Sequence, residues 1–423
     1  MPELQKHDPW AALRIRDFSF YISARFFLTL AVQIQSVVVG IQIYRLTPGE
    51  PTDKAFAMGM IGLAEAIPFI TLAIFAGHVA DVIKRRRIII NSIFFLLICT
   101  WLLFYISFNK TLLISLGTFP VYGIIFCTGI ARGFLGPVFP AFQSQLVPRA
   151  LYANASTWNS NLWMTAAVIG PATGTLLISN ADFHIPYGLS AVLVTLSLVL
   201  MFFVKDHPLP PREQKEKLSK SLTAGFRFVF SNQVMLSALS LDLFAVLFGG
   251  AVAMLPVFTH DVLHLGDFAD KAVGIMRAAV AAGSILMGLF LAYFPPTRKA
   301  GRNLFLAVIG YGLCIIVFAI SKNFYLSVLM LMLSGSFDMV SVVVRQTIMQ
   351  LIIPDNMRGR VSAVNGIFIG SSNEIGEMES GIAAKLMGTI PSVIFGGCMT
   401  IVVVCVVFVS APKLRKLNLN KLV

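Results

Sequence analysis

The chain alternates between long apolar runs and short polar segments. An apolar run of about 20 residues can cross a bilayer as a helix. Because lipid offers the backbone no hydrogen-bonding partner, each such run has to be helical. The pattern therefore predicts twelve membrane-spanning helices. We expect them at residues 18–44, 56–77, 88–108, 112–140, 155–178, 186–204, 232–258, 270–294, 303–320, 323–351, 359–385 and 389–410.

The longest polar interruption is the segment 205–223, which contains three prolines and charges of both signs. This composition is typical of a linker between domains. It divides the chain into an N-terminal half, residues 1–204, and a C-terminal half, residues 224–423. We predict an all-α membrane protein whose twelve transmembrane helices form two pseudo-symmetric six-helix halves joined by a cytoplasmic linker.

The distribution of Lys and Arg predicts the orientation. Polar segments on the side of the N-terminus carry 22 of these residues, and the segments on the other side carry six. Short basic loops stay in the cytoplasm, so we expect both termini there, in a bacterial-type inner membrane. The first apolar run begins near Phe18 and is too long for the core of a signal peptide, so we expect an uncleaved first span.

Composition agrees with a membrane protein. The chain is 57% hydrophobic and 13% charged, with a mean hydropathy of +0.81, whereas soluble domains are about 25% charged. A formal charge of +13 could indicate nucleic acid, but most bases lie in short loops between spans, so we expect the lipid bilayer as the partner and no nucleic acid. The five cysteines lie within apolar runs without metal-ligand spacing, which predicts neither disulfides nor a metal site.

Charged residues inside the predicted spans are the main sign of function. Each would cost at least about 2.5 kcal/mol facing lipid, so such residues face the bundle interior and mark pathways or ion pairs. Their number favours transport. They are Arg25, Arg132, Arg277 and Arg345, with Arg227 near a span entry, and the acids Glu65, Asp242, Asp338, Glu374, Glu377 and Glu379.

The first span has one polar stripe. It consists of Arg25, Thr29, Gln33, Ser36 and Gly40, spaced by three or four residues, which places them on one helix face. They could form the wall of a cavity, with Arg25 contacting a substrate or pairing with Glu65, or only a hydrogen-bonded seam between helices. Glu65 could also carry a proton, because a carboxyl group away from water favours its neutral form.

The eleventh span has a face of small and polar residues. These are Gly366, Gly370, Asn373, Glu377 and Gly381. Glu374 precedes Glu377 by three residues, so the two carboxyl groups lie on nearly the same face. Two carboxylates this close do not easily both ionise, and one would hold a proton as a switch. Alternatively an arginine neutralises one acid and the glycines only allow close helix packing.

Asp242 and Asp338 lie near the middle of the seventh and tenth spans. Either could pair with an arginine for structure or take part in proton coupling, and the sequence does not separate these interpretations.

The short loop between the second and third spans carries one acid and four consecutive bases. Gly77 and Asp81 precede Lys84, Arg85 and Arg86, and Arg87 completes the run. Such a basic loop fixes the orientation of its two flanking spans.

This loop resembles that of transporters of the major facilitator superfamily, and the resemblance extends over nearly the whole chain. Gly77, Asp81, Arg85 and Arg86 match the superfamily pattern, whereas Val82 and Lys84 replace an Arg and a Gly. The resemblance implies that the matching residues form a cytoplasmic latch between the second and eleventh spans.

Two further motifs carry the same resemblance. Arg132 and Gly136 resemble the motif of the fourth span that is implicated in proton coupling, and Gly170, Pro171 and Gly174 resemble the Gly-Pro motif of exporters. Within the superfamily the chain is similar to the enterobactin-exporter-like branch of siderophore and drug efflux proteins. The segments that carry this similarity are residues 24–26, Gln42, residues 225–228, and Asn373, Glu374 and Gly381.

We expect a monomeric, proton-driven exporter of a small amphipathic molecule that works by alternating access. The proposed substrate and proton pathway is Arg25, Gln33, Glu65, Asp242, Asp338, Asn373, Glu374 and Glu377. A flippase or facilitator of lysophospholipids with the same fold is the alternative, and a non-transporting sensor or assembly protein is an alternative of another class. We expect no enzyme and no cofactor beyond the proton gradient, because zinc-protease, Walker and nucleophile-elbow motifs do not occur.

Overall fold

The computed structural model describes residues 8–178, 182–207, 218–294, 296, 298–354 and 357–419. Its first seven α-helices precede the predicted linker. They are α1 (Arg16–Leu46), α2 (Pro51–Val82), α3 (Arg85–Phe108), α4 (Lys110–Leu116), α5 (Phe119–Leu146), α6 (Tyr152–Leu177) and α7 (His184–Phe203).

Nine α-helices follow. They are α8 (Leu218–Ser231), α9 (Gln233–Phe248), α10 (Leu255–Val257), α11 (Ala269–Tyr293), α12 (Ala300–Ile320), α13 (Phe324–Ile352), α14 (Arg358–Met387), α15 (Thr389–Ser410) and α16 (Pro412–Arg415). Short 3-10 turns and one π-helical turn, Phe258–Val262, connect some of them. The described part of the chain contains no strand, and the prediction of an all-α membrane fold is confirmed.

Ten helices within the described residues are long and apolar enough to cross a membrane. The two other helices of comparable length in the predicted spans are α6 and α14, which are rich in Asn, Ser, Thr and Gly. The polar residues of α14 include Asn373, Glu374 and Glu377, which line the central cavity described below, whereas α6 contributes Trp163 to it.

Two predicted spans are not single helices. The run 112–140 is interrupted at Gly117, whose φ of 63° lies in the left-handed region that favours glycine, so α4 and α5 are separate. The run 232–258 is interrupted at Gly249, where α9 ends and a 3-10 turn, Gly250–Val252, leads to α10. Within the segment predicted as the linker, α8 is described from Leu218 onward.

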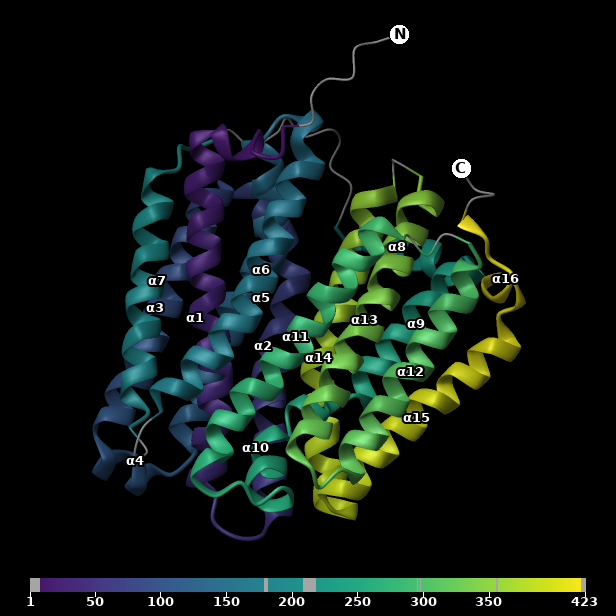
Figure 1. The fold of residues 1–423 in the computed structure, drawn as a ribbon. Helices are drawn as coiled ribbons and strands as arrows, with labels where there is room; N and C mark the ends of the chain where they lie inside the picture. The colour runs from purple at the N-terminus through teal and green to yellow at the C-terminus, as the bar shows by residue number, and fades with distance from the viewer. Residues whose placement is uncertain are drawn as a thin grey trace.

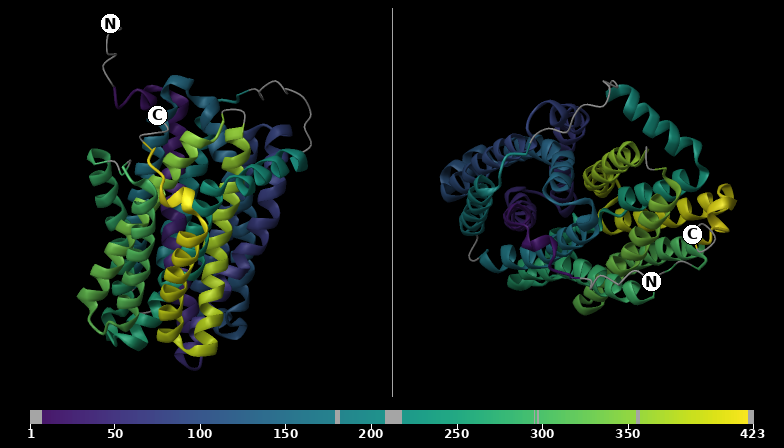
Figure 2. Two further views of the ribbon diagram at one scale, coloured as in Figure 1. Left: turned by 90° about the vertical axis from the view of Figure 1, so that its right-hand side faces the viewer. Right: turned by 90° about the horizontal axis from the view of Figure 1, so that it is seen from above.

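The helices that precede residue 205 and those that follow residue 217 lie side by side as two groups (Figure 1). We call them the first half and the second half. The described chain begins and ends at the same end of the bundle, which we call the termini end, and α4 and α10 lie near the opposite, distal end (Figure 1). Viewed from above, the helices of the two halves surround a central region (Figure 2).

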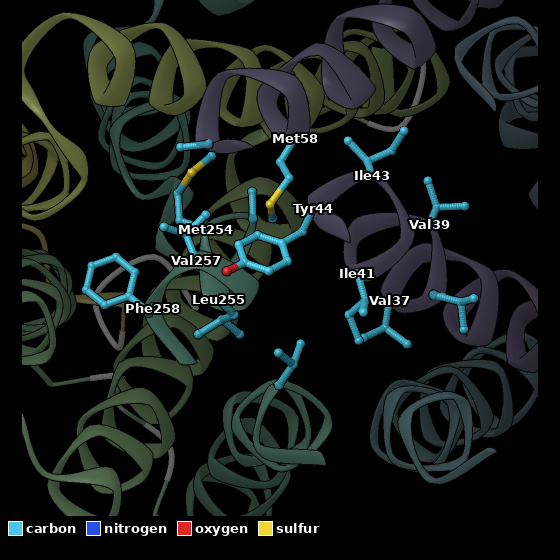
Figure 3. Packing of buried hydrophobic residues seen from close by; sticks show 14 of the residues in the cluster. Val37, Val39, Ile41, Ile43, Tyr44, Met58, Met254, Leu255, Val257 and Phe258 are labelled. Atoms are coloured by element: carbon cyan, nitrogen blue, oxygen red, sulfur yellow. The ribbon is translucent and has the colours of Figure 1, made fainter. Parts of the chain in front are cut away.

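The hydrophobic cores differ between the two ends. At the distal end a single buried cluster contains residues of both halves, including Tyr44 of α1, Met58 of α2 and Phe258 after α10 (Figure 3). Toward the termini end one cluster contains only first-half residues, such as Phe18 and Phe142, and two others contain only second-half residues. The two halves are therefore packed together at the distal end.

Glycines allow the halves to approach closely along two pairs of helices. Between α2 and α14, a Cβ atom on Gly59 would lie 2.6 Å from the Cα of Gly381. Between α6 and α11, a Cβ atom on Gly274 would lie 3.0 Å from the carbonyl oxygen of Pro171. Real Cβ atoms do not approach backbone atoms this closely, so small residues are required at these seams.

Candidate functional site

A cavity of about 380 Å³ lies between the two halves, toward the middle of the bundle. Its volume lies within the range of small-molecule sites, roughly 300 to 1,000 Å³. Its polar wall comes mainly from α1, α2, α5, α11 and α14. The charged and polar side chains that line it are Gln33, Gln35, Ser36, Glu65, Thr128, Arg132, Arg277, Asn373, Glu374 and Glu377.

Arg132 connects carboxylates of both halves. Its guanidinium forms an ion pair with Glu65 of α2, within the first half, and its Nη2 lies 3.3 Å from an Oε1 of Glu374 on α14 of the second half. The sequence suggested Arg25 as the partner of Glu65. Instead, Arg25 donates to the hydroxyl of Tyr21 at 3.3 Å and lies over the Phe139 ring.

The polar stripe of α1 faces two adjoining spaces. Gln33, Ser36 and Gly40 line the central cavity, whereas Arg25 and Thr29 line a smaller crevice between α1 and α6. Arg277 of α11 reaches across from the second half and donates a hydrogen bond of 3.0 Å to the hydroxyl of Ser36. The stripe is thus a cavity wall that also carries a contact between the halves.

A second cavity of about 190 Å³ lies inside the second half. Asn373 and Glu377 line both this cavity and the central one, so the two cavities meet at α14. Gly249, where the seventh span is interrupted, lines this second cavity. Tyr311 donates a hydrogen bond of 3.2 Å to the Gly249 carbonyl oxygen.

The two aspartates of this second cavity differ in their surroundings. Asp242 forms an ion pair with Arg345, and both residues are only 6% exposed. Asp338 also lines the cavity, and no ion pair joins it to the described cations. The sequence left pairing and proton coupling open for both residues. The geometry gives Asp242 a structural partner and leaves the carboxyl group of Asp338 facing the cavity.

Ion pairs and hydrogen bonds connect the halves at the distal end. Arg45 at the end of α1 pairs with Asp270 at the start of α11, and the ring of His260 lies 2.9 Å from the same carboxylate. Tyr44 donates a hydrogen bond of 2.8 Å to Asp261. A second ion pair joins the halves between α14 and α2, where Lys385 pairs with Asp53.

These distal contacts were not predicted from the sequence, in which Arg45, Lys54 and Lys385 indicate only the orientation of the spans. The available signal was the presence of acids, Asp53 and Asp270, at the facing ends of other spans.

The basic loop between α2 and α3 contacts α5 and the start of the predicted linker. Lys84 and Arg86 donate to the carboxylate of Asp206 at 2.9 and 3.3 Å, and Arg85 donates to the carbonyl oxygen of Ala141 at 2.8 Å. The hydrogen bond from Lys84, followed by that from Arg86, holds the pKa of Asp206 below its usual value. Gly77 and Asp81 lie on α2, but their side-chain positions are outside the described part of the structure, so the predicted latch to α14 stays a prediction.

The two motif segments of α5 and α6 are packing surfaces. Gly136 faces the ring of Phe69 on α2. A Cβ atom on Gly170 would lie 2.5 Å from that of Gln33, and one on Gly174 would lie 2.8 Å from a methyl carbon of Val37. Gly170 and Gly174 therefore bring α6 against the polar stripe of α1, and Pro171 lies between them within an unbroken helix.

Among the residues that the structure describes, no group of three or more His, Cys, Asp or Glu side chains could hold a metal ion. The polar groups of the central cavity can accept hydrogen bonds, donate them and exchange protons, which suits reversible binding of a small molecule.

The fold is similar to that of solved membrane transporters. The structure of a D-xylose–proton symporter matches with a TM-score of 0.71 at 13% sequence identity, covering 96% of this chain and 99% of that one. A bacterial homologue of the human lysosomal transporter Spinster, in an inward-facing and unoccupied conformation, matches with a TM-score of 0.67 at 14% identity, covering 99% and 98%. The protein therefore has the fold of these multi-pass membrane transporters.

The chain belongs to the family described as transmembrane secretion effectors, whose family model matches residues 7–422. The enterobactin exporter of Shigella flexneri is 25% identical over 378 residues, which cover 86% of this chain and 82% of that protein. An uncharacterized transporter of the same superfamily from Bacillus subtilis (strain 168) is 24% identical over 293 residues, covering 66% and 69%. The resemblance to the enterobactin-exporter-like branch is thereby confirmed, and a small-molecule substrate and an inner-membrane location follow from it.

Proposed function

We propose that this protein is a proton-driven exporter of a small amphipathic molecule, such as a siderophore or a drug-like compound. The observation that carries the proposal is the cavity between the halves, in which one guanidinium, that of Arg132, is shared by Glu65 of the first half and Glu374 of the second. Export is supported by the Gly-Pro motif of α6 and by the similarity to the enterobactin exporter of Shigella flexneri.

The cycle is alternating access between two six-helix halves, residues 1–204 and 224–423. The distal end is closed by the shared hydrophobic cluster and by the ion pairs of Arg45 and Lys385. With both termini in the cytoplasm, as the distribution of basic residues indicates, this is a state closed to the outside. Substrate enters from the cytoplasmic side, and separation of the distal contacts releases it outside.

Protons enter this cycle through the carboxyl groups around the cavities. Two carboxylates compete for Arg132, and Glu377 lies where the two cavities meet, with no ion pair to a described cation. A proton on Glu374 removes the charge that attracts Arg132 across the boundary between the halves. A proton on Glu377 neutralises a carboxylate that would otherwise stay unpaired in a region of low dielectric constant. Asp338 extends the set of candidate proton carriers into the second half.

The test uses purified protein in vesicles that contain a pH-sensitive dye. A catecholate siderophore and the cationic dye ethidium are the two probes, because they represent the siderophore-like and drug-like classes. We expect an imposed pH gradient to drive one probe against its concentration gradient, and addition of that probe to move protons. Probe movement that is independent of the pH gradient would contradict proton coupling.

A matched pair of variants on α14 sharpens the test. Glu377→Gln removes the titratable group where the cavities meet, and we expect it to abolish the response to pH. Glu379→Gln is the control, because Glu379 lines neither cavity and accepts only a long hydrogen bond of 3.5 Å, from the hydroxyl of Ser380, within the described part of the chain. Movement of a fluorescent lysophospholipid without a gradient would favour the flippase alternative.

A further inference from the structure

Phe69 of α2 and Gly370 of α14 fit together across the boundary between the halves. A Cβ atom added to Gly370 would collide with the ring of Phe69 and lie 2.6 Å from its Cζ. The same ring meets Gly136 of α5 on its other side, where an added Cβ would lie 4.0 Å from Cε2. The phenyl ring thus lies between a first-half glycine and a second-half glycine.

Arg132 and its two partners, Glu65 and Glu374, form what we call the charge bridge. The contact between Phe69 and Gly370 is one helical turn from this bridge on both α2 and α14. On α2, Phe69 follows Glu65 by four residues, and on α14, Gly370 precedes Glu374 by four residues. Side chains at this spacing lie on the same helix face. Phe69 and Gly370 both line the central cavity, as do the three charged residues of the bridge.

Near the cavity, the other close contacts of this seam involve glycines, and the ion pair between Lys385 and Asp53 lies further away, at the distal end. Gly59 and Gly381 bring the two backbones together without a side chain, and an added Cβ on Gly62 would lie 2.7 Å from the Cβ of Glu377. Smooth glycine surfaces permit close approach, but they leave rotation and sliding of one helix against the other weakly restrained. A ring seated in a notch restrains both movements, because packed side chains interlock.

We propose that Phe69, seated on Gly370, is the positioning residue that sets the register of α14 against α2, so that Glu374 reaches Arg132. When the halves rock, the ring leaves Gly370 and the ion pair between Arg132 and Glu374 separates in the same movement. The inference rests on the proposed transport cycle, but the contact itself can be tested without a substrate.

The test measures the distance between α2 and α14 in the purified full-length protein. Nitroxide labels are attached to cysteines introduced at Ile67 and Ile369, which are 48% and 38% exposed, after replacement of the five native cysteines. We expect one narrow distance distribution in the parent protein, and a broadened or shifted distribution in both Phe69→Ala and Gly370→Ala. The double variant Gly370→Ala with Phe69→Val, which exchanges bulk across the contact, should restore the narrow distribution.

Gly366→Ala is the matched control, since Gly366 lies one turn away on the same helix and none of the described atoms comes within 4 Å of its added Cβ. Its distance distribution should equal that of the parent. The passive leak of protons into vesicles is a second measurement. A variant that only loses packing would not recover the parent leak in the double variant. We expect the leak to rise roughly tenfold in each single variant and to return in the double variant.

Two results would overturn the inference: Gly370→Ala behaving like Gly366→Ala, or the double variant being no better than the worse single variant. Phe69→Leu, which keeps most of the bulk, covers the case in which Phe69→Ala does not fold, and it should give an intermediate leak. If proton-driven transport itself is wrong, the parent protein shows no response to pH while the distance results still hold, so the two failures can be distinguished.

Discussion

Arg45 at the end of α1 forms an ion pair with Asp270 at the start of α11, and this contact joins the two halves at the distal end of the bundle. Its side chains are 30% and 10% exposed, so the pair is partly withdrawn from water. A contact of this kind stabilises the state in which the distal end is closed and is lost when that end opens.

Arg45→Gln should therefore shift the protein toward the state with an open distal end. Losing a partly buried pair costs about 1 to 2 kcal/mol, which corresponds to roughly a tenfold change in the ratio of the two states. Distances between labels on the distal ends of α1 and α11 measure this ratio. Arg14→Gln is the control, because Arg14 is 75% exposed and pairs with Asp8 in its own half. An equal shift in both variants would contradict the role of Arg45.

Arg132→Gln should destabilise the protein more than removal of either acid that Arg132 contacts. It leaves Glu65 and Glu374 as two neighbouring carboxyl groups without a cation, at a cost of about 3–5 kcal/mol. Glu374→Gln leaves Arg132 paired with Glu65 and should cost less. Unfolding in mixed micelles gives the free energies, and Glu379→Gln supplies the baseline. The reverse order of stability would show that Arg132 is not the centre of the bridge.

Asp242→Asn and Asp338→Asn should separate stability from transport. Asp242→Asn leaves the buried guanidinium of Arg345 without its carboxylate, so we expect a loss of about 3–5 kcal/mol. Asp338→Asn breaks no described ion pair and should leave the unfolding free energy within about 1 kcal/mol, while it weakens the response of transport to pH. Equal destabilisation by both variants would argue that Asp338 has a structural partner.

The contact between the basic loop and Asp206 should depend on pH. Because Lys84 and Arg86 hold the pKa of Asp206 below the usual value of 3.8, the contact is complete above about pH 4 and is lost as the pH falls through the lowered pKa. Amide hydrogen exchange at residues 203–207, corrected for its intrinsic pH dependence, should rise over this acidic range. Asp206→Asn should show the faster exchange already at neutral pH. An acid-induced rise of the same size in Asp206→Asn would exclude Asp206 as its cause.

The helices could be predicted from the sequence because hydropathy responds directly to the bilayer. The two interrupted spans could not, since the apolar pattern continues through Gly117 and Gly249 and no charged residue marks the break. Glycine alone signals a possible interruption, and most glycines of the spans, such as Gly170, serve close packing instead.

The cavity residues were largely predictable, but their partners were not. Charges within spans have to face the interior, which identified Glu65, Glu374 and Glu377. Whether Glu65 meets Arg25 or Arg132 depends on the rotation and depth of three helices, and these follow from packing at positions such as Gly129, where an added Cβ would lie 2.7 Å from the Glu65 carbonyl oxygen. Hydropathy contains no information about this contact.

The interruption at Gly249 divides the seventh span into two segments that contact different parts of the protein. The piece before it, α9, carries Asp242 and is tied to α13 through Arg345. The piece after it, residues 250–262, carries Phe258 and His260 and belongs to the closed distal end. In the proposed cycle, a joint at this position would let residues 250–262 move outward while Asp242 stays paired with Arg345, so the distal end would open without breaking that buried ion pair.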